Sequence, residues 1–157
     1  MKKGIYISII AIFVGCRFHP KGDLPSFNLL LSDSNTVFNT KNIPAGKPSI
    51  LIFFSPYCEH CQAETNDLLE KIDSFNKVNI YFITIDPMKE MKVFEGYYKL
   101  SIYPNITVGK DISYFFPAHF KGVIPPYSIV YDKYKQQRAV VKGQASAALL
   151  ISIISKI

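Results

Sequence analysis

The sequence contains no tryptophan, only three cysteines and only three histidines among its 157 residues. Three cysteines cannot supply the two paired sets of ligands that structural zinc sites usually need, so we expect no metal site of that kind. The chain has no run of five or six like charges, although its formal net charge is +6. Nucleic-acid binding needs a clustered cationic surface, so the scattered lysines predict a solvated basic surface and no nucleic-acid partner.

Low-complexity tracts and internal repeats are absent as well. Hydrophobic residues make up 48% of the chain and charged residues 19%, a balance that supplies a core and excludes wholesale disorder. The length suits one domain of ordinary size. We therefore expect a single globular domain after the N-terminal segment.

The N-terminal segment has the composition of an export signal. Lys2 and Lys3 precede an apolar run at residues 5–14, and Gly15 and Cys16 follow it. A bilayer-spanning helix needs about 20 apolar residues, so this run is too short to be one. A positive start, a short apolar run and a small residue at its end are typical of a secretory signal peptide, which we assign to residues 1–15. The alternative is a buried N-terminal strand or helix in which Cys16 is an ordinary free cysteine.

Residues 13–16, Phe-Val-Gly-Cys, resemble the lipobox of bacterial lipoproteins, with Phe13 where leucine is usual. In that class of protein the cysteine is acylated and becomes the first residue. The resemblance implies a lipid on Cys16 that anchors an exported, periplasmic protein to a membrane. Residues 16–25 would then be the lipidated N-terminus and a linker, because residues 17–25 contain proline, glycine and aspartate without apolar periodicity. Residues 26–157 would form the domain.

With Cys16 set aside, Cys58 and Cys61 remain as a lone Cys-x-x-Cys pair, which in an oxidising compartment is a candidate redox couple. A continuous apolar run at residues 49–54 predicts a buried strand before the pair, and apolar residues at helical spacing predict a helix at residues 62–75. Cys58 would therefore lie near a helix N-terminus, where free amides favour an anionic sulfur. We expect Cys58 to attack a disulfide and the more buried Cys61 to resolve the mixed disulfide.

The two residues between the cysteines carry opposite expectations. A protonated His60 would support a thiolate on Cys58, whereas Glu59 would oppose it. We assign both residues to redox tuning, and a solvated His60 without a role is the alternative. The sequence does not decide the net effect, so it does not predict the redox potential.

The rest of the sequence predicts an alternation of strands and helices. Continuous apolar runs rich in β-formers indicate strands, and apolar residues at helical spacing indicate helices. The predicted strands cover residues 78–85, 127–131 and 137–142, the predicted helices cover 88–100, 111–120 and 145–157, and residues 27–31 and 36–38 could add an N-terminal hairpin. The order strand, helix, strand, helix, hairpin, helix is that of a thioredoxin fold, an α/β domain with a central mixed β-sheet flanked by helices.

Three segments resemble one branch of that fold. Residues 54–61 match its strand-to-active-site segment, Glu64 matches the acid of its Cys-x-x-Cys-x-x-Glu pattern, and residues 123–132 match its cis-proline loop and following strand. From about Leu24 to its end, the chain resembles the TlpA/ResA-like branch of the thioredoxin superfamily, in the form common among lipoproteins of Bacteroidetes-type bacteria. The chain departs from the pattern at Tyr57, where the family often has tryptophan.

The resemblance implies roles for the residues around the cysteines. Pro126 takes the cis-proline position, and Tyr57, Ile124 and Pro125 would contact an incoming peptide. Ordinary trans prolines that open a strand are the alternative, since cis bonds are uncommon even before proline.

The resemblance also bears on proton transfer. Thioredoxin itself has a buried aspartate six residues before its first cysteine, whereas this chain has Ile52 there. Glu64 is then the remaining candidate for moving protons near Cys61. The alternative for Glu64 is an exposed acid in the first turns of a helix, where carboxylates are favourable anyway.

The function that the resemblance implies is a thiol–disulfide oxidoreductase without a cofactor, which exchanges a Cys58–Cys61 disulfide or dithiol with exported proteins. It favours a reductant recharged by a membrane electron donor, although the opposite direction stays open because it depends on potential and partners. The Pro-x-x-x-Thr/Ser-x-x-Cys setting of a peroxiredoxin cysteine is absent. The alternative from another class is a membrane-tethered copper-binding or delivery module that uses the same cysteines, with His119 as a distal ligand.

Overall fold

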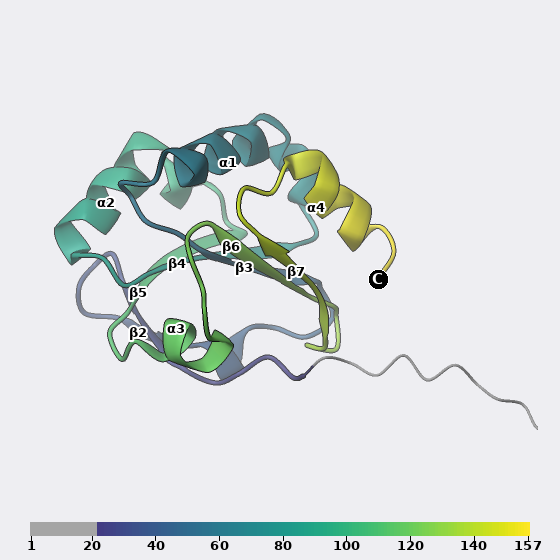
Figure 1. The fold of residues 1–157 in the computed structure, drawn as a ribbon, viewed down its shortest axis with the longest axis horizontal. Helices are drawn as coiled ribbons and strands as arrows, with labels where there is room; N and C mark the ends of the chain where they lie inside the picture. Colours follow the sequence, from purple (N-terminus) through teal and green to yellow (C-terminus); the bar gives the residue numbers. More distant parts are fainter. Residues whose placement is uncertain (1–21) are drawn as a thin grey trace, which may run out of the picture.

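The computed structural model describes residues 22–157, so the expected signal peptide and Cys16 lie outside the described residues (Figure 1). Within this part of the chain no helix has both the length and the apolar character needed to cross a membrane. The elements are, in chain order, β1 (Asn28–Leu31), β2 (Val37–Asn39), β3 (Ser49–Phe53), α1 (Glu59–Glu70), β4 (Asn79–Thr84), α2 (Met88–Tyr97), β5 (Ile106–Asp111), α3 (Phe115–Phe120), β6 (Tyr127–Tyr131), β7 (Gln137–Lys142) and α4 (Ala147–Ile154).

All these strands belong to one mixed sheet, in the order β2-β1-β5-β4-β3-β6-β7. The middle strands β3, β4 and β5 are parallel to one another. On one side β6 and β7 continue the sheet antiparallel, and on the other side β1 and β2 do so as the hairpin that the sequence predicted. The predicted thioredoxin-like α/β fold is therefore confirmed.

Alternate residues of the central strands face two separate cores, because successive side chains of a strand point to opposite faces. Ile50 and Ile52 belong to a core that includes residues of α1, α2 and α4. Leu51 and Phe53 belong to a second core that includes residues of α3 and β1. Figure 1 shows the same division, with α1, α2 and α4 on one face of the sheet and α3 on the other. Within residues 22–157 the strands form one sheet and each face of that sheet carries a core, so this part of the chain has the pairings and cores of a folded domain.

All four predicted helices are shorter in the structure than in the prediction, and two of them end at a break in the helical backbone. The helix predicted at residues 62–75 begins at Glu59 and ends at Glu70, and a separate 3-10 turn covers Ile72–Phe75. The helix predicted at residues 88–100 ends at Tyr97, and Lys99 has a left-handed backbone (φ 51°) before the next 3-10 turn. In both places apolar spacing continues past the break, which explains why periodicity alone did not locate it.

Strand β5 is missing from the sequence prediction, which instead begins a helix at Asp111. In the structure Asp111 ends β5, and the helix α3 starts only at Phe115. The strand pairs with β4 and β1 through Gly109, where an added Cβ would lie 2.8 Å from the Cβ of Leu29. Glycine is thus required for the close approach of β1, yet glycine and lysine within the strand weaken the β-pattern in the sequence.

The cysteine pair and the β6–β7 turn lie at opposite ends of the sheet. In the antiparallel pairing of β3 with β6, Ser49 lies opposite Tyr131 and Phe53 lies opposite Tyr127. The chain reaches Cys58 soon after Phe53, whereas the β6–β7 turn follows Tyr131. The first described residues pair with the chain at that turn. The backbone N of Leu24 donates to the carbonyl of Lys135 (2.9 Å), and the backbone N of Gln137 donates to the carbonyl of Gly22 (3.0 Å).

Candidate active site

Cys58 is the residue that caps the N-terminus of α1. Its backbone is extended (φ −88°, ψ 114°), and its Sγ accepts a hydrogen bond from the backbone N of Cys61 at 3.3 Å. A sulfur here takes the place of the serine, threonine or aspartate oxygen that usually caps a helix. The free amides and the helix dipole at this position favour negative charge on the sulfur. Cys58 is half-buried, so a partner can still reach it.

Cys61 lies one turn further along α1 and is only 2% exposed. Burial, together with its hydrogen bond to Cys58, raises the pKa of the Cys61 thiol far above its ordinary value. The thiol is therefore neutral until a base removes its proton. This difference in exposure between the two cysteines is the one that the sequence predicted.

Glu64 is buried, with 1% of its surface exposed, so the alternative of an exposed surface acid is wrong. Its Oε1 accepts a hydrogen bond from Ser128 Oγ (2.9 Å) and its Oε2 accepts one from the backbone N of Ala145 (2.9 Å). Burial raises the pKa of Glu64, and the two hydrogen bonds oppose that rise. Residues three apart lie on the same face of a helix, and the Glu64 charge contributes to the raised pKa of Cys61. A carboxyl group with increased proton affinity thus lies near the buried thiol.

The loop before β6 faces the Cys58 sulfur. Its Pro125–Pro126 peptide bond is cis, as the family resemblance implied, and Pro126 is buried. The carbonyl oxygen of Pro125 lies 3.7 Å from Cys58 Sγ. Ile124, one residue earlier, is 76% exposed. The loop therefore presents a backbone carbonyl at the sulfur and, one residue earlier in the chain, an exposed apolar side chain.

A hollow of about 450 Å³ adjoins Cys58 and is bounded by Tyr57 and Pro125. Asp86 is the charged residue of its other walls, which are mainly apolar and include Phe53, Phe54, Ile85, Pro117 and Val123. Thr84 Oγ1 donates to Asp86 Oδ2 at 3.2 Å, which orients the carboxylate. The structure therefore places Tyr57 and Pro125, two of the predicted contact residues, around one concave surface next to the sulfur.

The residues assigned to redox tuning are both exposed on the first turn of α1. His60 Nδ1 lies 3.1 Å from Gln144 Oε1, in the loop between β7 and α4. The exposed His60 ring therefore has one polar contact with the protein. An effect of Glu59 or His60 on the redox potential stays a prediction.

Helix α3 contributes Pro117 to the hollow and is held by a buried carboxylate. Asp111 Oδ2 accepts a hydrogen bond from the backbone N of Phe116 (2.7 Å), and its Oδ1 accepts two from Ser113. His119 stacks on Phe115, with ring centroids 4.9 Å apart, and does not line the hollow. Among residues 22–157 no three histidine, cysteine or acidic side chains are grouped to share a metal ion.

Sequence reasoning missed three polar residues of this region: Ser128, Gln144 and Asp86. Ser128 left a signal, because it is the polar residue within a strand that otherwise reads Tyr, Ile, Val, Tyr and lies two positions after the cis proline. A buried hydroxyl needs a partner, so a strand of this kind calls for a polar group on the facing helix. Gln144 and Asp86 lie in loops, where the sequence carries no such pattern.

The comparison with known families gives a match over residues 20–139, which is most of the domain, to the AhpC/TSA family. The chain belongs to the AhpC/TSA family. Its membership and its cysteine pair make it a thioredoxin-like thiol–disulfide oxidoreductase. A search of curated proteins finds no match.

Solved structures show the same fold at low sequence identity. A secreted disulfide oxidoreductase of Mycobacterium tuberculosis, homologous to E. coli DsbE, is 21% identical with a TM-score of 0.69, over 83% of this chain and 96% of that one. StoA from Bacillus subtilis is 15% identical with a TM-score of 0.64, over 82% and 96%. The peroxidoxin BcpB from Mycobacterium tuberculosis is also 15% identical, with a TM-score of 0.71 over 87% and 96%. These likenesses support the fold of the AhpC/TSA chain described here.

Proposed function

We propose that this chain is an exported, membrane-anchored reductant of protein disulfides, of the TlpA/ResA-like kind. The observation that carries the proposal is the position of the Cys58 sulfur. It caps α1, is accessible, and lies 3.7 Å from the Pro125 carbonyl. A substrate chain that runs along the residues before Pro126 would bring its own disulfide to this sulfur.

In the first step the Cys58 thiolate attacks one sulfur of a substrate disulfide. A bond forms between Cys58 Sγ and that sulfur, the substrate disulfide breaks, and the leaving sulfur departs as a thiolate that takes a proton. The free amides and the dipole at the start of α1 favour the negative charge that the attacking sulfur carries. Tyr57, Ile124 and Pro125 would hold the flanking residues of the substrate during this step.

In the second step Cys61 releases the product. Its thiol loses a proton and attacks Cys58 Sγ, so that the Cys58–Cys61 disulfide forms and the second substrate sulfur leaves as a thiol. Across both steps the substrate gains two electrons and two protons. The cysteine pair supplies both electrons and the Cys61 proton, and solvent supplies the second proton, because Cys58 starts as a thiolate. Glu64 is the proposed acceptor of the Cys61 proton, because its raised pKa suits it to take a proton that an ordinary carboxylate would hold weakly.

The substrates would be exported proteins, and a membrane electron donor would return the pair to the dithiol form. This assignment rests on the signal peptide expected at residues 1–15 and on the lipid expected at Cys16. Mass spectrometry of the protein from membranes tests it, with an acylated N-terminal Cys16 as the expected product. Secretion of an unmodified chain, or retention of residues 1–15, would contradict the anchor.

The reduction potential of the Cys58–Cys61 couple, measured against glutathione on the chain from Arg17 onward, tests the redox direction. A value near that of thioredoxin, about −270 mV, is expected for a reductant. A value between about −180 and −120 mV would instead indicate an oxidant or isomerase. If no reversible couple exists, the oxidoreductase role fails, and copper binding by the reduced cysteines becomes the function to test.

A further inference from the structure

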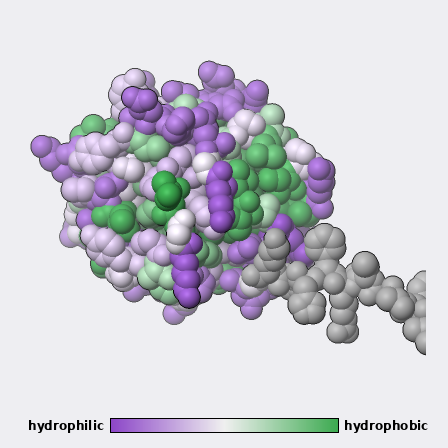
Figure 2. All heavy atoms as spheres, in the orientation of Figure 1, coloured by the Kyte–Doolittle hydropathy of each residue, from purple (hydrophilic) through white to green (hydrophobic). Residues whose placement is uncertain are grey.

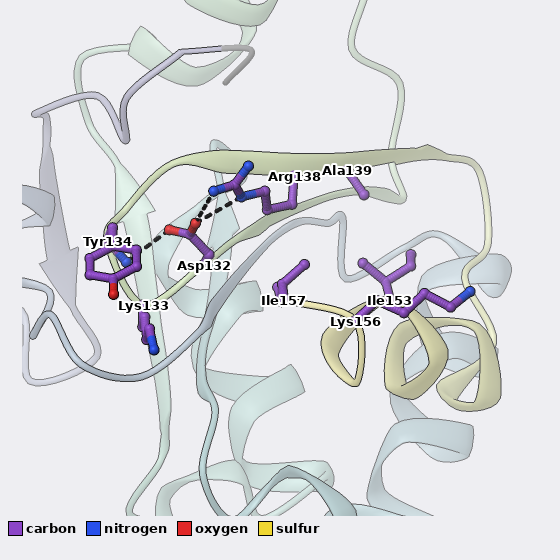
Figure 3. A pocket seen from close by; sticks show the side chains of 8 residues that line it. All are labelled: Asp132, Lys133, Tyr134, Arg138, Ala139, Ile153, Lys156 and Ile157. Carbon is purple, nitrogen blue, oxygen red and sulfur yellow. Dashed lines mark hydrogen bonds and ion pairs between the residues drawn. The ribbon is translucent and has the colours of Figure 1, made fainter. Parts of the chain in front are cut away.

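A groove of about 500 Å³ lies at the end of the sheet opposite the cysteines, between the β6–β7 turn and α4 (Figure 3). Ala139, Ile153 and Ile157 give it an apolar wall. Figure 2 shows the same side of the molecule, where hydrophobic residues gather over α4 and β7. The mechanism at Cys58 uses none of these residues.

Cationic side chains border this apolar wall. Lys133 and Lys156 line the groove, and both are exposed. The described part of the chain has one ion pair, between Arg138 and Asp132, so neither lysine has a carboxylate partner there. Asp132 is neutralised by Arg138, which leaves the border of the groove positively charged. The fold thus brings two lysines that are 23 positions apart in the sequence, Lys133 and Lys156, to the same groove.

The tip of the β6–β7 turn adds an aromatic residue to this surface. Tyr134 is 69% exposed, and Lys133 Nζ lies 5.1 Å from the centre of its ring. A ring with one polar end, beside lysines that carry long apolar stems, suits the boundary between lipid headgroups and acyl chains. An apolar wall with a cationic border suits the same boundary, because acyl chains are apolar and anionic headgroups attract lysines.

Gly22, the first residue that the structure describes, pairs with the start of β7 near this surface. Gly22 accepts a hydrogen bond from the backbone N of Gln137 at 3.0 Å, at the start of β7. Six residue steps separate Gly22 from Cys16, and six steps span at most about 20 Å. A lipid on Cys16 would therefore hold this end of the domain, and not the cysteine end, close to the bilayer.

We propose that the surface formed by Lys133, Tyr134, Lys156, Ile153 and Ile157 binds the anionic headgroup region of a membrane. The short tether is part of this argument, and that part rests on the proposed acylation of Cys16. Binding here directs Cys58 away from the bilayer, toward exported proteins. The surface itself needs no lipid on the chain, so it can be tested apart from the anchor and from the redox chemistry.

The absence of tryptophan makes a direct test possible with the chain from Arg17 onward. The Y134W variant carries a single tryptophan in the proposed surface, and the Y57W variant carries one at the cysteine end, where Tyr57 is 64% exposed. With brominated vesicles of phosphatidylglycerol and phosphatidylcholine in equal parts, we expect quenching of the Y134W fluorescence and none for Y57W. Equal quenching of both variants, stronger quenching of Y57W, or no quenching of either would overturn the proposal.

Sedimentation with the same vesicles tests the lysines. Each lysine near an anionic surface contributes about fivefold in affinity, so K133Q/K156Q should bind about 25-fold more weakly. The matched control K89Q/K92Q removes the same charge from exposed positions on α2 and should bind like the unmodified chain. Added salt should weaken binding, and vesicles of phosphatidylcholine alone should bind little. An equal loss in both double variants would refute a defined surface, and a normal Cys58–Cys61 couple in each variant would show that the domain is folded.

Discussion

The hydrogen bond from Ser128 to Glu64 leads to a prediction about stability and pH. Replacing Ser128 with alanine leaves Glu64 Oε1 without its side-chain donor, while Oε2 keeps the Ala145 amide. A hydrogen bond to a charged group contributes about 1.5–3 kcal/mol, and one between neutral groups about 0.5–1.5 kcal/mol. S128A should therefore lower the free energy of unfolding by about 1.5–3 kcal/mol where Glu64 is ionised and by about 0.5–1.5 kcal/mol where Glu64 is protonated.

The sign follows from the pKa of Glu64, which the fold raises above its ordinary value of 4.5. A raised pKa means that folding favours the protonated carboxyl. Its contribution to stability is present below pH 4.5 and is lost as the pH rises through the folded value. S128A removes a bond that is strongest to the ionised form, so the free energy of unfolding should fall more steeply with pH in the variant than in the unmodified protein.

Urea unfolding followed by far-UV circular dichroism, at pH values from 4.5 upward, measures this difference. The control is the E64Q background, where an amide can donate to Ser128 and accept from Ala145 at every pH. There S128A should cost about 0.5–1.5 kcal/mol without pH dependence. A penalty for S128A that is the same at all pH values, or the same in both backgrounds, would refute this account of the Glu64 charge.

Three further substitutions test separate parts of the structure. C61S should accumulate a mixed disulfide between Cys58 and substrate, visible on non-reducing gels, whereas C58S should form none; turnover by C61S at the normal rate would contradict the resolving role. G109A should lower the free energy of unfolding by about 1–3 kcal/mol, because the new Cβ would meet Leu29 Cβ at 2.8 Å; an unchanged denaturation midpoint would show that β1 can shift freely. D111A should cost about 1–3 kcal/mol and weaken substrate binding, since it releases the start of α3 and with it Pro117; D111N, which keeps an oxygen acceptor, should cost less.

The parts of the fold that the sequence predicted are those with strong local patterns. The strands at Tyr127–Tyr131 and Gln137–Lys142 have the bounds that were predicted, because apolar runs and a polar turn mark them clearly. Strand β5 was not predicted, because it contains Gly109, a residue that is uncommon in strands. The glycine is required because strand β1 packs too close for a side chain at this position. Non-local requirements of this kind leave no periodic trace in the sequence.

The cysteine site was predictable to a similar degree. The spacing of Cys58 and Cys61 between a strand and a helix was enough to predict a sulfur near a helix N-terminus and a more buried partner, and the structure adds that the sulfur caps the helix. The burial of Glu64 was not predictable, because it depends on Ser128 and on the amide of Ala145, which lie 64 and 81 residues away in the chain. Only the closed sheet brings these groups together.

The buried acid of this site comes from α1, and strand β3 carries an isoleucine beside the serine that holds it. Ile52 stands where thioredoxin has a buried aspartate, and in the sheet Ile52 pairs with Ser128 of β6. The hydroxyl of Ser128 holds a carboxylate that comes from α1 instead of from β3. Glu64 and Cys61 lie three residues apart on α1, so the backbone of one helix sets the spacing between the acid and the thiol. The proposed proton acceptor therefore comes from the helix that carries the resolving cysteine, and Ser128 of β6 and the Ala145 amide hold it there.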